Sequence, residues 1–251
     1  MSKDRKAFRE SLGFSSEKKT QMFLKFTDEI PLDWKRLKAC NTRVKDIFAK
    51  INKIIYPEIQ VDLDEFNRKI DTVYKEMKKN NLFQKLTNNG RNPTDVYYSW
   101  LRGYATCEFF VKSISLIFDT STDNIKRIGK DDFTNINVFK RTSDADLEVI
   151  IDDTLKYKLE VQSGFTGANH IKKTKIDRAK NVKRHENIES YLIHFDIFNG
   201  RVALCCTSNI NTEHITWIHR FENSKVIPIA DDSFKWNLEE KPKKYTELSY
   251  N

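Results

Sequence analysis

The chain has 251 residues, 39% hydrophobic and 32% charged, so it is long enough to bury a core beneath a heavily charged surface. Its formal net charge of +8 and its pI of about 9.1 favour a polyanionic partner. Composition argues against an integral membrane protein, a P-loop protein and a zinc protein, because the sequence lacks a long apolar run, a glycine-rich phosphate loop and Cys/His ligand spacing.

The start of the sequence has no apolar segment typical of a secretory signal, and the four cysteines form no CxxC pair. We therefore expect a cytoplasmic protein with reduced, buried thiols.

Residues 1–90 carry helical patterns. Apolar residues recur at helical spacing from Trp34 to Tyr56, and Pro57 ends that pattern. A second apolar stripe, from Phe66 to Met77, predicts another helix. Because the stretch 88–90 (NNG) then marks a break, the sequence predicts a helical subdomain over 1–90 and a core over 91–251.

A long helix is predicted to begin at Asn92-Pro93, with Asn92 as N-cap and Pro93 in the first turn. Its apolar stripe runs from Val96 to Phe118. Glu108 lies at the edge of that stripe, either as a solvated glutamate or as part of a site.

After residue 134 the hydrophobic period changes from helical to two. Strands are expected over 135–141, 146–151 and 155–162, with a turn at 152–154. In the second and third of these strands, the apolar residues point to one face, and Asp146, Glu148, Glu160 and Gln162 point to the other.

The following segments complete the expected core. Residues 169–184 read as a helix with seven Lys and Arg against one Asp, a local charge of +6. Strands 190–198 and 201–207 flank Asn199-Gly200, which suits a type I′ hairpin turn, and His194 is interpreted as a core histidine. The order predicts an α/β fold with a mixed central β-sheet flanked by helices, preceded by the helical subdomain.

The two acidic strands form a hairpin in which residues whose numbers sum to about 306 lie opposite each other. Asp146 and Glu160 are then cross-strand neighbours, with Cβ atoms roughly 5 Å apart. Two ionised carboxylates at that separation repel unless a cation lies between them. Mg²⁺ prefers such oxygen ligands, so the pair predicts a magnesium site. Asp144 has the same strand parity and is the alternative to Asp146.

This arrangement resembles the PD-(D/E)XK nuclease superfamily. Ala145-Asp146 stands where the family has Pro-Asp, and Glu160-Val161-Gln162 stands for (D/E)xK. The stretch 103–110 with Glu108 is similar to the family's preceding helix, and 169–184 to its following helix. The resemblance covers roughly residues 92–210.

The resemblance implies a restriction-endonuclease-like core that hydrolyses phosphodiesters with Mg²⁺. Its metal ligands would be Asp146, Glu160 and the carbonyl of Val161, with Gln162 and Glu108 as further catalytic residues. The size of the chain resembles type II restriction endonucleases, which implies sequence-specific cleavage of double-stranded DNA by a homodimer. Residues 1–90 would then serve dimerisation or DNA contact.

Gln162 departs from the family pattern, because a lysine there would stabilise charge on the attacked phosphate, whereas glutamine only forms hydrogen bonds. A lysine of the next helix could replace it, and Lys172, Lys173 and Lys175 all remain open. The basic helix and its approach are expected to bind DNA, through Asn169, His170, Lys172, Lys173, Lys175, Arg178 and Lys180.

Other functions stay open at this point. A non-catalytic DNA-binding module could keep the nuclease fold, and repair or junction nucleases share the same core. An RNA-processing or protein-interaction domain is a further alternative. A hairpin with solvated acids beside a solvated cationic helix is the plainer structural interpretation of the same residues.

Overall fold

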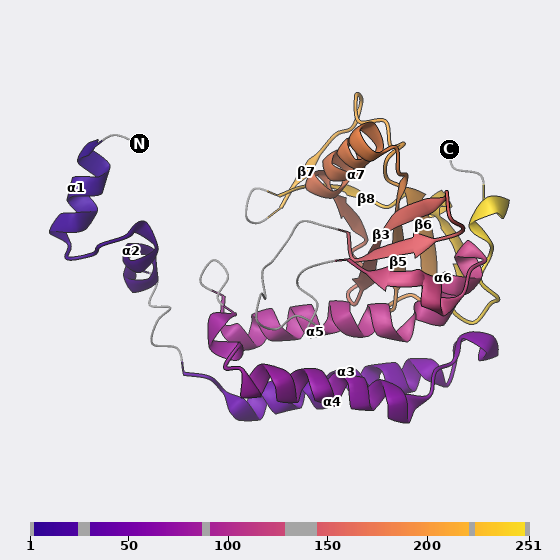
Figure 1. Cartoon of the computed structure of the whole chain (residues 1–251), viewed down its shortest axis with the longest axis horizontal. Coiled ribbons are helices and arrows are strands. Elements are labelled where there is room, and N and C mark those ends of the chain that lie inside the picture. The colour runs from indigo at the N-terminus through magenta and orange to yellow at the C-terminus, as the bar shows by residue number, and fades with distance from the viewer. Residues whose placement is uncertain (1–2, 25–30, 87–90, 129–144, 221–223, 249–251) are drawn as a thin grey trace.

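A computed structural model describes residues 3–24, 31–86, 91–128, 145–220 and 224–248 (Figure 1). The α-helices are α1 Lys3–Ser11, α2 Glu17–Leu24, α3 Trp34–Asn52, α4 Leu63–Lys79, α5 Pro93–Phe109, α6 Val111–Phe118 and α7 Lys173–Glu186. The strands are β1 Ile125–Arg127, β2 Leu147–Ile150, β3 Lys156–Gly164, β4 His170–Lys172, β5 Ser190–Asp196, β6 Arg201–Cys206, β7 Ile218–His219, β8 Lys225–Pro228 and β9 Phe234–Asn237. The predicted α/β class with a mixed, helix-flanked sheet is confirmed.

Helices α3, α4 and α5 form layers on one side of the larger sheet, with α5 between the other two and the strands (Figure 1). Asp33 caps α3 by accepting the Arg36 N–H at 2.8 Å, and Asp62 caps α4 in the same way. The predicted helices are confirmed here, although α3 ends at Asn52. One hydrophobic cluster runs from Leu37 on α3 through α5 to the inner face of the sheet.

The predicted long helix after Asn92 is interrupted. Asn92 caps α5 by accepting the Thr94 N–H at 2.8 Å, as expected. At Phe110, however, the backbone leaves helical geometry (φ −94°, ψ 13°), and α6 starts anew. The Phe110 ring is buried and stacks on Phe195 of β5, with ring centroids 3.9 Å apart. The break therefore lies where the helix packs directly on the sheet.

The larger sheet has the strand order β1-β2-β3-β5-β6-β9. β2 and β3 are antiparallel in the predicted register, with Leu147 opposite Leu159 and Val149 opposite Tyr157. β3 and β5 are parallel and are joined through α7, which covers the other face of the sheet. The predicted strand 135–141 lies outside the described residues, and the strand beside β2 is instead β1.

Two local predictions are wrong. The expected helix 169–184 begins only at Lys173, because β4 takes the preceding residues into a small sheet in which buried Ile171 pairs with Ile227. The β5–β6 hairpin is confirmed, but its connection is not a type I′ turn, since Gly200 has a positive φ and Asn199 does not. The Asp196 carboxylate accepts the backbone and side-chain N–H groups of Asn199, which holds a longer loop.

Candidate active site

The β2–β3 register brings Asp146 next to Glu160. Leu147 lies opposite Leu159, so Asp146, one residue earlier, reaches the next position of β3. The backbone N–H of Val161 donates to Asp146 Oδ2 at 2.8 Å. Because the N–H and C=O of a strand residue point toward the same neighbouring strand, the Val161 carbonyl also faces Asp146. The structure thus brings the Asp146 carboxylate to the Val161 backbone, one residue from Glu160.

Glu160 is held by two cations of α7. One carboxylate oxygen accepts a hydrogen bond from Lys175 Nζ, and the other accepts one from Arg178 at 2.6 Å. The Glu160 side chain is 12% exposed. Burial alone would raise its pKa, but Lys175 and Arg178 outweigh burial and hold the pKa below its usual value. Glu160 is therefore an ionised carboxylate enclosed by protein.

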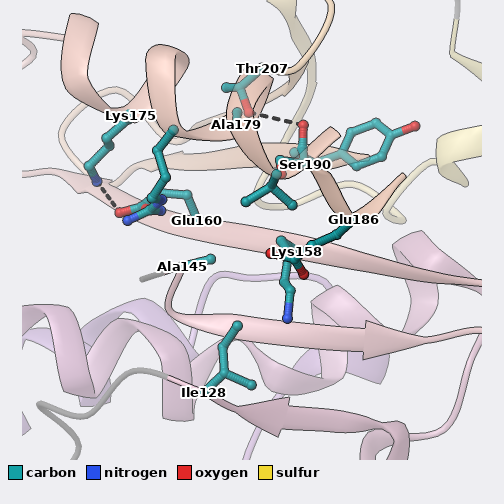
Figure 2. Close-up of a pocket in the computed structure, with 12 residues that line it drawn as sticks. Ile128, Ala145, Lys158, Glu160, Lys175, Ala179, Glu186, Ser190 and Thr207 are labelled. Atoms are coloured by element: carbon teal, nitrogen blue, oxygen red, sulfur yellow. Dashed lines mark hydrogen bonds and ion pairs between the residues drawn. The ribbon is translucent and has the colours of Figure 1, made fainter. Parts of the chain in front are cut away.

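A cavity of about 180 Å³ lies beside this carboxylate, between β3 and α7. Figure 2 shows Lys175 directed at Glu160 on one side of it, with Ala145 below, while Lys158 points away from Glu160 toward Ile128. Lys158 donates instead to its cross-strand partner Glu148 at 2.7 Å. The cavity thus has the carboxylate and its cations at one end.

The structure also distinguishes the candidate lysines. Lys175 reaches Glu160, whereas Lys173 pairs with Asp177 on its own helix at 2.6 Å. Lys172 is exposed at the end of β4. Gln162, which stands at the motif lysine position, donates its amide to the backbone carbonyl of His170 at 2.8 Å. Lys175 is therefore the lysine whose charge lies at the acid pair, and Gln162 fixes the start of β4.

Glu108 is engaged elsewhere. Arg127 of β1 donates to it at 2.7 Å, and Lys69 of α4 lies 3.1 Å from its other oxygen. Burial raises its pKa less than these two cations lower it, so the net pKa is below the usual value. The neighbouring thiol of Cys107 is buried, which raises its pKa, and the charge of Asp146 raises it further. The charges of Glu108, Asp146 and Glu160 each raise the pKa of this thiol, so Glu108 lies near the acid pair. Its own oxygens, however, join α5 to α4 and β1.

The predicted DNA-contact residues divide into inward and outward groups. Asn169 points inward, because its amide donates to Asp196 at 2.8 Å and its oxygen lies 2.7 Å from His194 Nε2. A Cβ added at Gly164 would lie 2.7 Å from that oxygen, so only glycine permits this approach. His194 is buried as expected, and burial lowers its pKa to about 4.

The remaining members of that prediction lie on α7 or at its approach. Lys180 donates to Thr212 at 2.9 Å, and His170 Nε2 lies 3.3 Å from the Arg220 guanidinium. Arg220 was not predicted, since it lies far from the motif in sequence and nothing in its neighbourhood marks it. The alternative acid Asp144 lies outside the described residues.

The acid pair suits a hard cation. Within the described ranges, no group of three or more His, Cys, Asp or Glu side chains could hold a metal. The protein could supply the carboxylates of Asp146 and Glu160 and the Val161 carbonyl, which leaves positions for water or phosphate oxygens. Mg²⁺ is bound in this way, by few carboxylates and several waters. These donors are of the kind that magnesium prefers, but both Glu160 oxygens already accept hydrogen bonds from Lys175 and Arg178, so a cation would share that carboxylate with them.

Scans of protein-family models, curated proteins and solved structures find no match to this chain. In the described part of the chain, none of the helices has the length and apolar character needed to cross a membrane.

Proposed function

We propose that this protein is a Mg²⁺-dependent endonuclease that cleaves double-stranded DNA at specific sites, in the manner of a type II restriction endonuclease. The observation that carries the proposal is the register that places Asp146 beside Glu160, with Lys175 at the same carboxylate. The chain order around it also supports the proposal, because α6, the antiparallel strands β1, β2 and β3, the short strand β4, the basic helix α7 and the parallel strand β5 follow one another.

Each residue has a chemical task in this proposal. Asp146 and Glu160, with the Val161 carbonyl, would hold Mg²⁺, which supplies Lewis acidity toward the phosphate and lowers the pKa of a water. The Val161 N–H orients Asp146. The Lys175 ammonium is positioned to stabilise the negative charge that develops on the attacked phosphate, which is the task of the motif lysine. Gln162 holds β4, and hence the start of α7, in place.

The substrate class follows from charge. The chain carries a net charge of +8, and α7 adds its basic face beside the acid pair. A polyanion is the partner that this field attracts. Cutting both strands of a duplex in one event takes two such centres, so a two-fold homodimer is part of the proposal.

A second candidate is a DNA-binding module without catalysis. It is favoured by one observation: both oxygens of Glu160 already accept hydrogen bonds from cations of α7. Gln162 also lacks the charge of the motif lysine. In that case Glu160 would serve to anchor α7 on the sheet.

The deciding experiment incubates the protein with unmethylated phage-length duplex DNA, in Mg²⁺ or in EDTA. The variant Asp146→Asn keeps an oxygen that can accept the Val161 N–H but loses the charge, and Asp153→Asn at the exposed turn is the matched control. Discrete bands that need Mg²⁺, persist in Asp153→Asn and vanish in Asp146→Asn are expected. A smear would remove site specificity, cleavage of branched DNA alone would indicate a junction nuclease, and intact but gel-shifted DNA would favour the binding module.

A further inference from the structure

A second cavity, of about 410 Å³, opens where β3 ends, between α5 and the small sheet. It shares Lys175 with the cavity at Glu160, so the two cavities border the same lysine. Its other basic side chains come from three separate segments: Arg102 on α5, His170 and Lys172 on β4, and Arg220 after β7. These segments lie far apart in sequence, and the fold brings them together.

The charge in this cavity is not compensated locally. Its lining, as far as the structure describes the chain, includes no Asp or Glu. Among the described residues, Arg102, Lys172 and Arg220 make no ion pair, whereas Lys173 and Arg178 nearby are paired with acids. A protein surface that keeps three cations around one hollow without an acid favours an anionic ligand.

Arg102 is held in a fixed orientation. Its guanidinium lies over the rings of Tyr98 and Phe165, 4.8 Å from each centroid. Stacking of this kind leaves the planar edge of the guanidinium for bidentate contact with phosphate oxygens. The guanidinium is therefore preorganised to bind an anionic ligand.

The hydrogen-bond balance points the same way. Arginine has no acceptor, so in its contact with Arg220 the His170 Nε2 atom must accept, which places the imidazole proton on Nδ1. That Nδ1 atom and Arg102 Nε are both buried and have no partner in the described structure. Two donors in the wall of the cavity therefore lack an acceptor.

We propose that this cavity binds a non-scissile phosphate of the DNA strand whose scissile phosphate lies at Glu160. This inference rests on the proposed function, and it assigns Arg102, Lys172 and Arg220 to substrate binding. Lys175, common to both cavities, then lies between successive phosphates of one strand. A backbone contact of this kind fixes the register of the strand and carries no base specificity.

The test is a titration of labelled duplex DNA in EDTA, followed by fluorescence anisotropy at several salt concentrations. Lys172 and Arg220 are exposed, so the double variant Lys172→Gln/Arg220→Gln leaves the core intact. The matched control, Lys38→Gln/Lys75→Gln, removes two exposed charges from α3 and α4. We expect the cavity variant to lower the slope of log affinity against log salt by about 0.9 for each phosphate that the protein no longer neutralises, and the control to leave it unchanged.

A third variant separates charge from geometry. Arg102→Lys keeps the charge but loses the planar fork, so affinity should fall while the salt slope stays near that of the wild type. An equal loss of salt slope in Lys38→Gln/Lys75→Gln would overturn the proposed phosphate site, because the effect would then come from the overall charge of the protein and not from this cavity. Strong competition by inorganic phosphate at constant ionic strength would assign the cavity to a free phosphate, and would also overturn the strand contact.

The two proposals can fail separately, because binding is measured without Mg²⁺. If the protein cuts DNA but Lys172→Gln/Arg220→Gln leaves the salt slope unchanged, the proposed nuclease activity stands and the proposed phosphate site is wrong. If the salt slope of that variant falls as expected but the protein never cuts DNA, the phosphate site stands and the proposed nuclease activity is wrong.

Discussion

Glu108 and Glu160 have the same local chemistry and different surroundings. Each is a largely buried glutamate whose two oxygens contact two cations, and each has a lowered pKa for that reason. The cations at Glu108 come from α4 and β1, so its ion pairs join three elements. Those at Glu160 are Lys175 and Arg178, which lie three residues apart on one face of α7.

This difference separates an anchoring role at Glu108 from the catalytic role proposed for Glu160. Breaking the ion pairs of Glu108 would weaken the contact of α4 and α5 with β1 at the edge of the sheet. The cations of Glu160 both belong to α7, which buried Ile176 also packs against the sheet. Lys175 borders both cavities, so it can turn from the carboxylate to a phosphate while the packing of Ile176 keeps α7 in place. Glu160 also has Asp146 beside it, whereas the described partners of Glu108 are cations. An ion pair alone therefore does not identify a site, but its place in the fold does.

The largest expected effect comes from exchanging the two glutamates for glutamine, one at a time. If the proposed function is correct, Glu160→Gln should lower the Mg²⁺-dependent cleavage rate by at least roughly a thousandfold, about 4 kcal/mol of transition-state stabilisation, because it removes a proposed metal ligand. Glu108→Gln should leave cleavage within roughly tenfold, but lower the free energy of unfolding by about 2 kcal/mol, because Arg127 loses its charged partner.

Both variants are compared by single-turnover cleavage and by urea unfolding. If Glu108→Gln abolished cleavage while its unfolding curve matched that of the wild type, Glu108 would belong to the active site, as the resemblance to PD-(D/E)XK nucleases implies. The contrast between the two glutamates would then be wrong.

A smaller effect should distinguish the lysines of α7. Lys175→Gln removes the charge at Glu160 and should slow cleavage by about a hundredfold, the usual cost of losing one group that stabilises transition-state charge. Lys173→Gln, which breaks only the pair with Asp177, is the matched control and should stay near the wild-type rate. Equal losses in both variants would show that general basic charge, and not the position of Lys175, supports the reaction.

The acid pair could be located from sequence because its geometry is local. A short turn and a strict period of two determine which residue of β3 lies opposite Asp146, and no distant contact intervenes. The α/β class followed from the same change of period. The break at Phe110 could not be predicted in this way, because it depends on a ring of β5 that lies far along the chain.

The rest of the site depends on distant contacts. Lys175 reaches Glu160 because α7 begins at Lys173, and that start is set by the pairing of Ile171 with Ile227. Asn169 turns inward because β5 brings His194 and Asp196 beside it. No sequence pattern predicts such partners. Arg102 and Arg220 could not be predicted for the same reason, because only the folded chain brings them to one cavity.

The smallest expected effect is in the pH dependence of stability. The pKa of Glu108 is lower in the folded protein than its ordinary value of 4.5, so folding favours the ionised form. Its contribution to stability is thus complete above that value and is lost as the pH falls through the lowered folded pKa. Glu108→Gln lacks this contribution at every pH, so the gap in unfolding free energy between wild type and variant should narrow on acidification.

The measurement is urea unfolding of the wild type, Glu108→Gln and Glu160→Gln at neutral pH and at successively lower pH. It gives the gap in unfolding free energy between the wild type and each variant. The same sign holds at Glu160, whose pKa is also lowered, so both gaps should narrow over the same acidic range. A gap that widened on acidification would mean that the carboxylate is better stabilised protonated than ionised in the folded state. At Glu160 that result would remove the ionised ligand on which the proposed magnesium site depends, while at Glu108 it would remove the anchoring ion pairs.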